Sequence, residues 1–134
     1  MRFSIRSALI LAVLLGGIAL PTTAQDRQAQ LADARRLNQQ AVQLDQAGRY
    51  AEAVPLSQEA LAIFEKVLGP GHPVVATVLY NLAELYKAQG DYGRAAPLFQ
   101  RSLAIREKAL GPEHPDVART LNYLALVYQG QGDY

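Results

Sequence analysis

The chain of 134 residues contains no cysteine and no tryptophan, and it has only two histidines. Without cysteine it forms no disulfide and no thiolate metal site, and it cannot carry a lipid attached to a cysteine behind a signal segment. The absence of these covalent and metal-based devices means that packing alone must stabilise the fold.

Neither sign of charge is in excess. The whole chain has 13 basic and 12 acidic residues, and without its first 24 residues it has 11 and 12. Such a balance provides no basic stripe for a nucleic acid and no polybasic patch for a membrane surface. We therefore expect the chain to bind no nucleic acid.

One long hydrophobic run is present, at the N-terminus. Residues 8–20 are apolar and uncharged, Arg2 and Arg6 precede them, and small residues up to Ala24 follow. This order is typical of a secretory signal. The run of about 13 residues is shorter than the roughly 17 to 25 that span a bilayer. We expect residues 1–24 to be a signal peptide that exports the chain to the bacterial periplasm or the extracellular space, with no stable membrane insertion after cleavage. A retained membrane anchor is the alternative.

The rest of the chain repeats itself. Gly48, Gly90 and Gly132 are 42 residues apart, and each is followed two residues later by a tyrosine. When residues 48–92 are shifted by 42 positions, about 26 of the 45 pairs are identical. Self-similarity at a fixed period is the signature of a repeat architecture. The expected repeat domain is 25–134, with units at about 31–72, 73–114 and 115–134, the last one incomplete.

Apolar residues recur at spacings of three and four in five stretches, as expected for amphipathic helices. Glycine turns and Gly-Pro-x-His-Pro loops separate the stretches. The expected helices are 26–47, 50–68, 74–89, 92–110 and 115–131.

Single residues predict how these helices begin, end and bend. Gly48 should end the first helix in a left-handed conformation. Asp91 is placed to cap the fourth helix, whereas Arg49, at the equivalent position before the second, has no side-chain acceptor. Pro55 and Pro97 lie inside helices but crowd only small residues one turn back, so we expect a mild bend rather than a break.

The middle unit resembles the tetratricopeptide repeat. The residues that carry the resemblance are Leu79, Leu82, Ala83 and Tyr86, then Gly90-Asp91-Tyr92, then Ala95, Phe99 and Ser102. The ordinary unit has about 34 residues, and the longer period with Gly-Pro-x-His-Pro between units is similar to the subclass found in kinesin light chains. The resemblance implies an all-α fold, a right-handed α-solenoid of antiparallel helix pairs with about two and a half repeats.

The two outer units depart from the middle one. Gln40 and Ser57 replace the apolar Leu82 and Phe99, which suits a terminal repeat whose outer face meets water. The last helix has an apolar stripe and no following helix to cover it: Leu121, Leu124, Ala125 and Tyr128. Either the sequence is a fragment of a longer natural chain, which we favour, or the stripe docks on another subunit.

The two histidines occupy the same place in successive loops. Equivalent positions in stacked helix pairs lie roughly 10 Å or more apart, so His72 and His114 are unsuited to share a metal ion. No nucleophile or carboxylate is spaced to form a catalytic triad with either. We expect both to set the start of the helix that follows, and we predict no catalytic residues, no metal site and no cofactor.

The first helix of each unit carries the candidate binding residues. The resemblance implies that these helices line a concave groove in which asparagines clasp the backbone of an extended peptide. An amide side chain both donates and accepts hydrogen bonds, which suits main-chain recognition, and Arg119 could hold an acidic group. The candidates for peptide binding are Asn38, Tyr80, Asn81, Glu84, Lys87, Arg119, Asn122 and Tyr123. Ordinary solvated helix surface is the alternative.

The sequence therefore predicts a protein–protein interaction scaffold rather than an enzyme, with another protein or a peptide as its partner. Two alternatives stay open. The repeats could be a regulatory or targeting arm of a larger protein whose enzymatic domain lies beyond Tyr134, or a self-assembling module that associates through the uncovered last helix.

Overall fold

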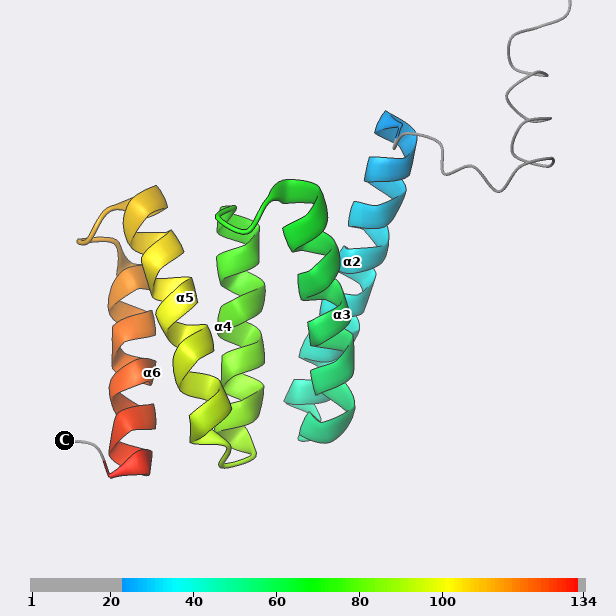
Figure 1. The fold of residues 1–134 in the computed structure, drawn as a ribbon. Helices are drawn as coiled ribbons and strands as arrows, with labels where there is room; N and C mark the ends of the chain where they lie inside the picture. Colours follow the sequence, from blue (N-terminus) through cyan, green and yellow to red (C-terminus); the bar gives the residue numbers. More distant parts are fainter. Residues whose placement is uncertain (1–22, 133–134) are drawn as a thin grey trace, which may run out of the picture.

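The computed structural model describes residues 23–132. This part of the chain is all-α and contains five helices. They are α2 (Ala24–Gln46), α3 (Tyr50–Leu68), α4 (Pro73–Ala88), α5 (Tyr92–Leu110) and α6 (Pro115–Gln131). Each helix packs against the next along the chain, in the order α2, α3, α4, α5, α6. Figure 1 shows the resulting row of antiparallel neighbours, which is an all-α solenoid.

The bounds of α3, α5 and α6 agree with those predicted. Helix α2 begins two residues earlier than predicted because Thr23 caps it. The Thr23 hydroxyl accepts a hydrogen bond from the backbone N–H of Asp26 (3.1 Å), and the Asp26 carboxylate accepts one from the backbone N–H of Thr23 (3.0 Å). This capping box satisfies two otherwise free donors. The predicted signal peptide 1–24, apart from its last two residues, lies outside the described part of the chain.

Turn and cap residues behave as the sequence predicts. Gly48 has φ +74°, a left-handed conformation that costs a glycine little. Asp91 Oδ1 accepts a hydrogen bond from the backbone N–H of Arg94 (3.2 Å), whereas Arg49 makes no side-chain cap. Pro55 lies within an unbroken helix, so the first turn tolerates its ring.

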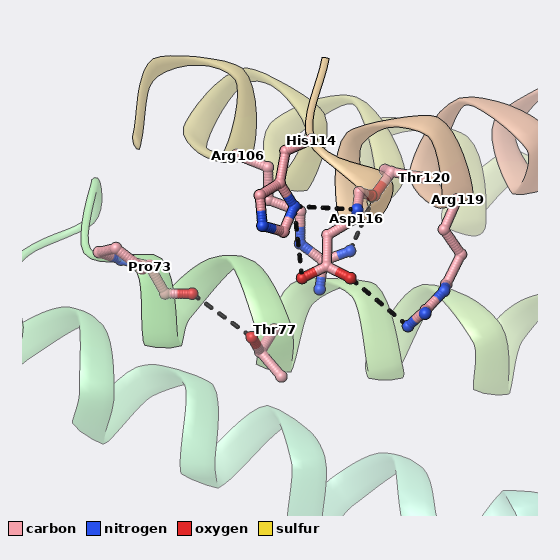
Figure 2. Close-up of polar contacts among 7 residues, drawn as sticks. All are labelled: Pro73, Thr77, Arg106, His114, Asp116, Arg119 and Thr120. Atoms are coloured by element: carbon pink, nitrogen blue, oxygen red, sulfur yellow. Dashed lines mark hydrogen bonds and ion pairs between the residues drawn. The ribbon is translucent and has the colours of Figure 1, made fainter. Parts of the chain in front are cut away.

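Both histidines cap the helix that follows them. His72 Nδ1 accepts a hydrogen bond from the backbone N–H of Val74, and His114 Nδ1 accepts one from that of Asp116, each at 3.1 Å. Figure 2 shows the second of these caps at the start of α6. The histidines use a ring nitrogen as Ser or Asp would use an oxygen, and this confirms that they set the start of the next helix. Because His72 is the cap, α4 begins at Pro73, one residue earlier than predicted.

The core follows the repeated apolar positions, with Leu79, Leu85 and Phe99 among its largest fully buried side chains. The last helix departs from the prediction in one respect. Leu124 is buried, at 8% exposure, because it packs into the main core cluster. Leu121 is 46% exposed. The stripe predicted to be uncovered is therefore covered in part by the preceding helices.

Candidate functional site

The predicted binding residues lie on α2, α4 and α6, the first helices of the three units. The 42-residue period places Asn38, Tyr80 and Asn122 at one equivalent position. Asn81 and Tyr123 share the next position along. The units therefore differ in the side chain at each equivalent position. These differences give the face two regions, an aromatic cluster and a polar pocket.

An aromatic cluster joins the second and third units. The Tyr80 ring meets Phe99 edge-on with 5.5 Å between centroids, and it meets Tyr123 edge-on at 5.4 Å. The Phe99 and Tyr123 centroids are 5.9 Å apart. Edge-to-face contacts at these separations are favourable beyond the area that they bury. Phe99 comes from α5, so the cluster ties together three helices.

Tyr80 does not project from the surface as predicted. Its side chain is only 7% exposed, and burial raises its pKa. The prediction assumed a narrow apolar stripe, whereas α4 is covered on several sides and buries Val75, Val78 and Leu79 next to it. Tyr80 is therefore part of the wall behind the candidate face.

Two cations lie against this cluster. The Lys87 ammonium is 4.5 Å from the centroid of the Tyr123 ring, and the Arg106 guanidinium is 4.7 Å from that of Tyr80. Arg106 is 8% exposed and donates from Nη1 to the Thr120 hydroxyl at 2.8 Å, a contact drawn in Figure 2. Burial lowers its pKa. Arg106 was not among the predicted site residues. The 42-residue period makes it equivalent to the buried Phe64, and this equivalence marks it as a charged residue at a core position.

Glu84 lies on the same face of α4, partly buried. Burial raises its pKa, and the neighbouring Asp45 adds to this effect. The Tyr123 hydroxyl, by hydrogen bonding, and the Lys87 charge pull the pKa in the opposite direction. The face thus brings Glu84, Lys87 and Tyr123 together in front of the buried Tyr80 ring, a mixture of rings and of both signs of charge.

A polar pocket joins the first and second units. It has a volume of about 150 Å³ and lies between α2, α3 and α4. Asn38, Ser57, Asn81 and the carboxylates of Asp45 and Glu84 line it. Three predicted residues, Asn38, Asn81 and Glu84, thus meet around one pocket, and Glu84 also lies near Tyr123 of the aromatic cluster.

The remaining two candidates lie on α6. Arg119 is exposed, and its Nη1 is 3.6 Å from the Asp116 carboxylate, as Figure 2 shows. An incoming acidic group would have to compete with this ion pair. Asn122 is exposed further along the helix. Neither residue contributes to the polar pocket.

A second groove was not predicted. It has a volume of about 440 Å³ and is mostly apolar, with Leu61, Leu82, Pro97 and Leu98 among its walls. Gln58 and Tyr86 also line it, and Gln58 Nε2 donates a hydrogen bond of 2.8 Å to the Tyr86 hydroxyl. The groove could not be predicted from the sequence because its residues come from three helices, α3, α4 and α5, and converge only when these helices pack.

Stacked antiparallel helix pairs and a mixed polar face on their first helices define a helical-repeat protein of the solenoid class. A tetratricopeptide repeat family model matches residues 46–108 and 88–134. The chain belongs to the tetratricopeptide repeat family. No curated protein matches it significantly. Within residues 23–132 no helix is both long and apolar enough to cross a membrane.

Two solved structures similar to the chain confirm the resemblance to kinesin light chains. One is BtubC (BKLC) from P. vanneervenii, with a TM-score of 0.66 and 28% identity over 96% of this chain and 47% of that one. The other is a putative kinesin light chain with nearly identical TPR-like repeats from Podosopora anserina, with a TM-score of 0.63 and 26% identity over 96% of this chain and 56% of that one. The chain spans about half the length of these structures.

Proposed function

We propose that the chain is an exported protein–protein interaction scaffold that binds an extended or helical segment of another protein across α2, α4 and α6. Tetratricopeptide repeats in general bind proteins or peptides. The observation that carries the proposal is the grouping of Glu84, Lys87 and Tyr123, with Asn81 in the wall of the pocket that Glu84 also lines. These groups can accept, donate and stack at one place, as a peptide-binding face requires.

The Lys87 ammonium supports a binding role. It lies over the Tyr123 ring, and its charge partly offsets the burial of Glu84. A peptide that enters here meets the Tyr123 ring, the ammonium over it and the nearby Glu84 carboxylate. Such a preformed surface loses little entropy on binding.

A random peptide display library tests the proposal. We expect the chain to enrich a related set of peptides, and we expect a Glu84→Ala/Lys87→Ala double variant to bind them at least tenfold more weakly. The matched control is Glu59→Ala/Lys66→Ala, which removes one charge of each sign from exposed positions on α3. Equal binding by both variants would contradict the proposed face.

A second candidate function is self-association through α6. Leu121 and Leu126 on this helix are 46% and 49% exposed, more than any other large apolar side chain in the described residues. Light scattering over a concentration series tests it. We expect a dimer that dissociates on dilution, and a Leu121→Gln/Leu126→Gln variant that stays monomeric. A monomer at every concentration would exclude this function.

Export rests on the sequence of residues 1–24, and N-terminal sequencing of the secreted or periplasmic protein tests it. Gln25 as the first residue supports cleavage after Ala24. Recovery of the intact chain in the membrane fraction would instead favour the retained anchor.

A further inference from the structure

The polar pocket occupies the place that the aromatic cluster fills one unit later. A shift of 42 residues places Tyr80, Phe99 and Tyr123 on Asn38, Ser57 and Asn81. In the second unit three rings are in contact there. In the first unit three small polar side chains stand in their place and leave a pocket of about 150 Å³. The same backbone positions thus form packed core in one unit and a lined opening in the other.

Two polar atoms of this pocket have no hydrogen-bond partner. They are Asn38 Oδ1 and Ser57 Oγ, and both atoms are buried. The Ser57 side chain is fully buried, at 0% exposure. Buried polar atoms in proteins are nearly always paired, and leaving one unpaired is costly. Both atoms lie just behind the pocket surface, where a group that reached them with hydrogen-bond donors would remove this cost.

The charge around the pocket is negative. The carboxylates of Asp45 and Glu84 both line it, and burial raises the pKa of each. Lys87 is the cation that acts on Glu84, but its ammonium lies over the Tyr123 ring of the aromatic cluster. An entering cation would thus meet two carboxylates that are only partly compensated.

The remaining walls are mostly apolar. Ala41 and Val42 of α2 and Leu85 of α4 form them, and the exposed Gln46 of α2 completes the lining. A long side chain that is apolar along its stem and cationic at its tip matches both kinds of wall. An ammonium group has three donors and no acceptor, which complements a site that presents acceptors and negative charge.

We propose that the pocket between Asn38, Ser57 and Asn81 binds the ammonium end of a lysine side chain of the partner. This inference rests on the proposed function, because it names one side chain of the peptide that the face would bind. The stem packs along Ala41, Val42 and Leu85, and the ammonium donates to Asn38 Oδ1 and Ser57 Oγ. Asp45 and Glu84 supply the compensating charge.

Two small probes that differ only at the tip test this inference on the full chain. One is N-acetyl-lysine N-methylamide, and the other is its norleucine counterpart, in which a hydrogen atom replaces the ammonium group. Titration into ¹⁵N-labelled protein is followed through the side-chain amide signals of Asn38 and Asn81. We expect saturable shifts with the lysine probe at concentrations at least tenfold lower than with norleucine. Equal shifts with both probes, or no shifts with either, would overturn the inference.

Two variants locate the probe. The triple variant Asn38→Tyr/Ser57→Phe/Asn81→Tyr installs the rings of the second unit, whose backbone already accommodates them, and we expect it to lose lysine binding completely. Asp45→Asn removes charge while keeping the shape, and we expect at least fivefold weaker binding. The control, Glu59→Gln, removes a carboxylate from an exposed position on α3. Should the triple variant fail to fold, unchanged binding by Asp45→Asn would still overturn the inference.

The display library separates this inference from the proposed function. Enriched peptides that share a lysine, and that lose this preference with the Asp45→Asn variant, support both. Enriched peptides with no lysine preference overturn the lysine pocket and leave the scaffold function standing. Binding of the lysine probe without any peptide enrichment supports the pocket and contradicts the scaffold function.

Discussion

At the scale of single residues, two buried serines show that a hydroxyl stabilises or destabilises the fold depending on whether it has a hydrogen-bond partner. Ser102 and Ser57 are both fully buried on the second helix of a unit. Ser102 Oγ donates to the backbone carbonyl of Ala76 at 2.7 Å, whereas Ser57 Oγ has no partner. Since an unpaired buried hydroxyl keeps its desolvation cost, we expect opposite results when each hydroxyl is removed.

The prediction is that Ser57→Ala raises the free energy of unfolding by about 1 kcal/mol and that Ser102→Ala lowers it by about the same amount. Urea denaturation of the two variants and the parent chain measures both changes. A loss of stability in Ser57→Ala equal to that in Ser102→Ala would show that Ser57 has a partner in solution.

Asp45 and Glu84 predict a particular pH dependence. Burial raises the pKa of each above its ordinary value, so the folded state favours the protonated form. This preference contributes to the free energy of unfolding. The contribution is fully present below the ordinary pKa and is lost as the pH rises through the folded-state pKa. Asp45→Asn and Glu84→Gln should therefore stabilise the chain at pH 7, each by less than about 1 kcal/mol because solvent screens partly exposed groups.

Urea denaturation at pH 7 and at pH 4 measures this dependence, and the gain from each variant should shrink at the lower pH. Asp26 serves as a control of opposite sign, because its hydrogen bonds with Thr23 lower its pKa. The contribution of Asp26 to the free energy of unfolding is present above its ordinary pKa and is lost as the pH falls through its folded-state pKa. Asp26→Asn should therefore destabilise the chain at pH 7. A gain from Asp45→Asn or Glu84→Gln that does not shrink at pH 4 would contradict the account.

At the scale of elements, equivalent helices differ in their caps. Asp91 caps α5, whereas Arg49 leaves α3 uncapped. We expect Asp91→Ala to lower the free energy of unfolding by about 1 kcal/mol and Arg49→Asp to raise it by a similar amount, because the second change supplies the missing acceptor. Thermal unfolding followed by circular dichroism measures both. Arg49→Ala is the control, and its effect should be small because it removes only an exposed ion pair with Glu52.

The helices were also the part of the fold that the sequence predicted best. Gly48 and Asp91 act locally, so their positions predict where helices end and begin without knowledge of the packing. Thr23 was missed as a cap because it fell within a run already assigned to the signal segment. Tyr80 was assigned to the surface because helical spacing does not reveal how many neighbours cover a helix.

The polar pocket could be predicted only in part. Asn38 and Asn81 were named as binding residues, and Ser57 was noticed as a polar residue at a core position. That these three side chains converge depends on the positions of α2, α3 and α4 relative to one another, which periodicity does not provide. Arg106 shows the same limit in part, because the 42-residue shift marks its core position but its hydrogen bond to Thr120 depends on how α6 packs against α5.

At the scale of the whole molecule, the face across α2, α4 and α6 and the apolar groove near Leu61 and Leu98 are two possible places for a partner. The face combines charge, rings and unpaired acceptors, whereas the groove is mostly apolar, with the hydrogen-bonded Gln58 and Tyr86 in its wall. The proposed function assigns the partner to the face. The location of a bound peptide therefore tests the account more directly than its affinity does.

The decisive measurement is the map of backbone amide NMR shifts on the full chain when a peptide selected from the display library binds. We predict that the largest shifts fall on α2, α4 and α6, around Asn81 and Lys87. Shifts concentrated on α3 and α5, around Leu61 and Leu98, would contradict it and would assign partner binding to the apolar groove.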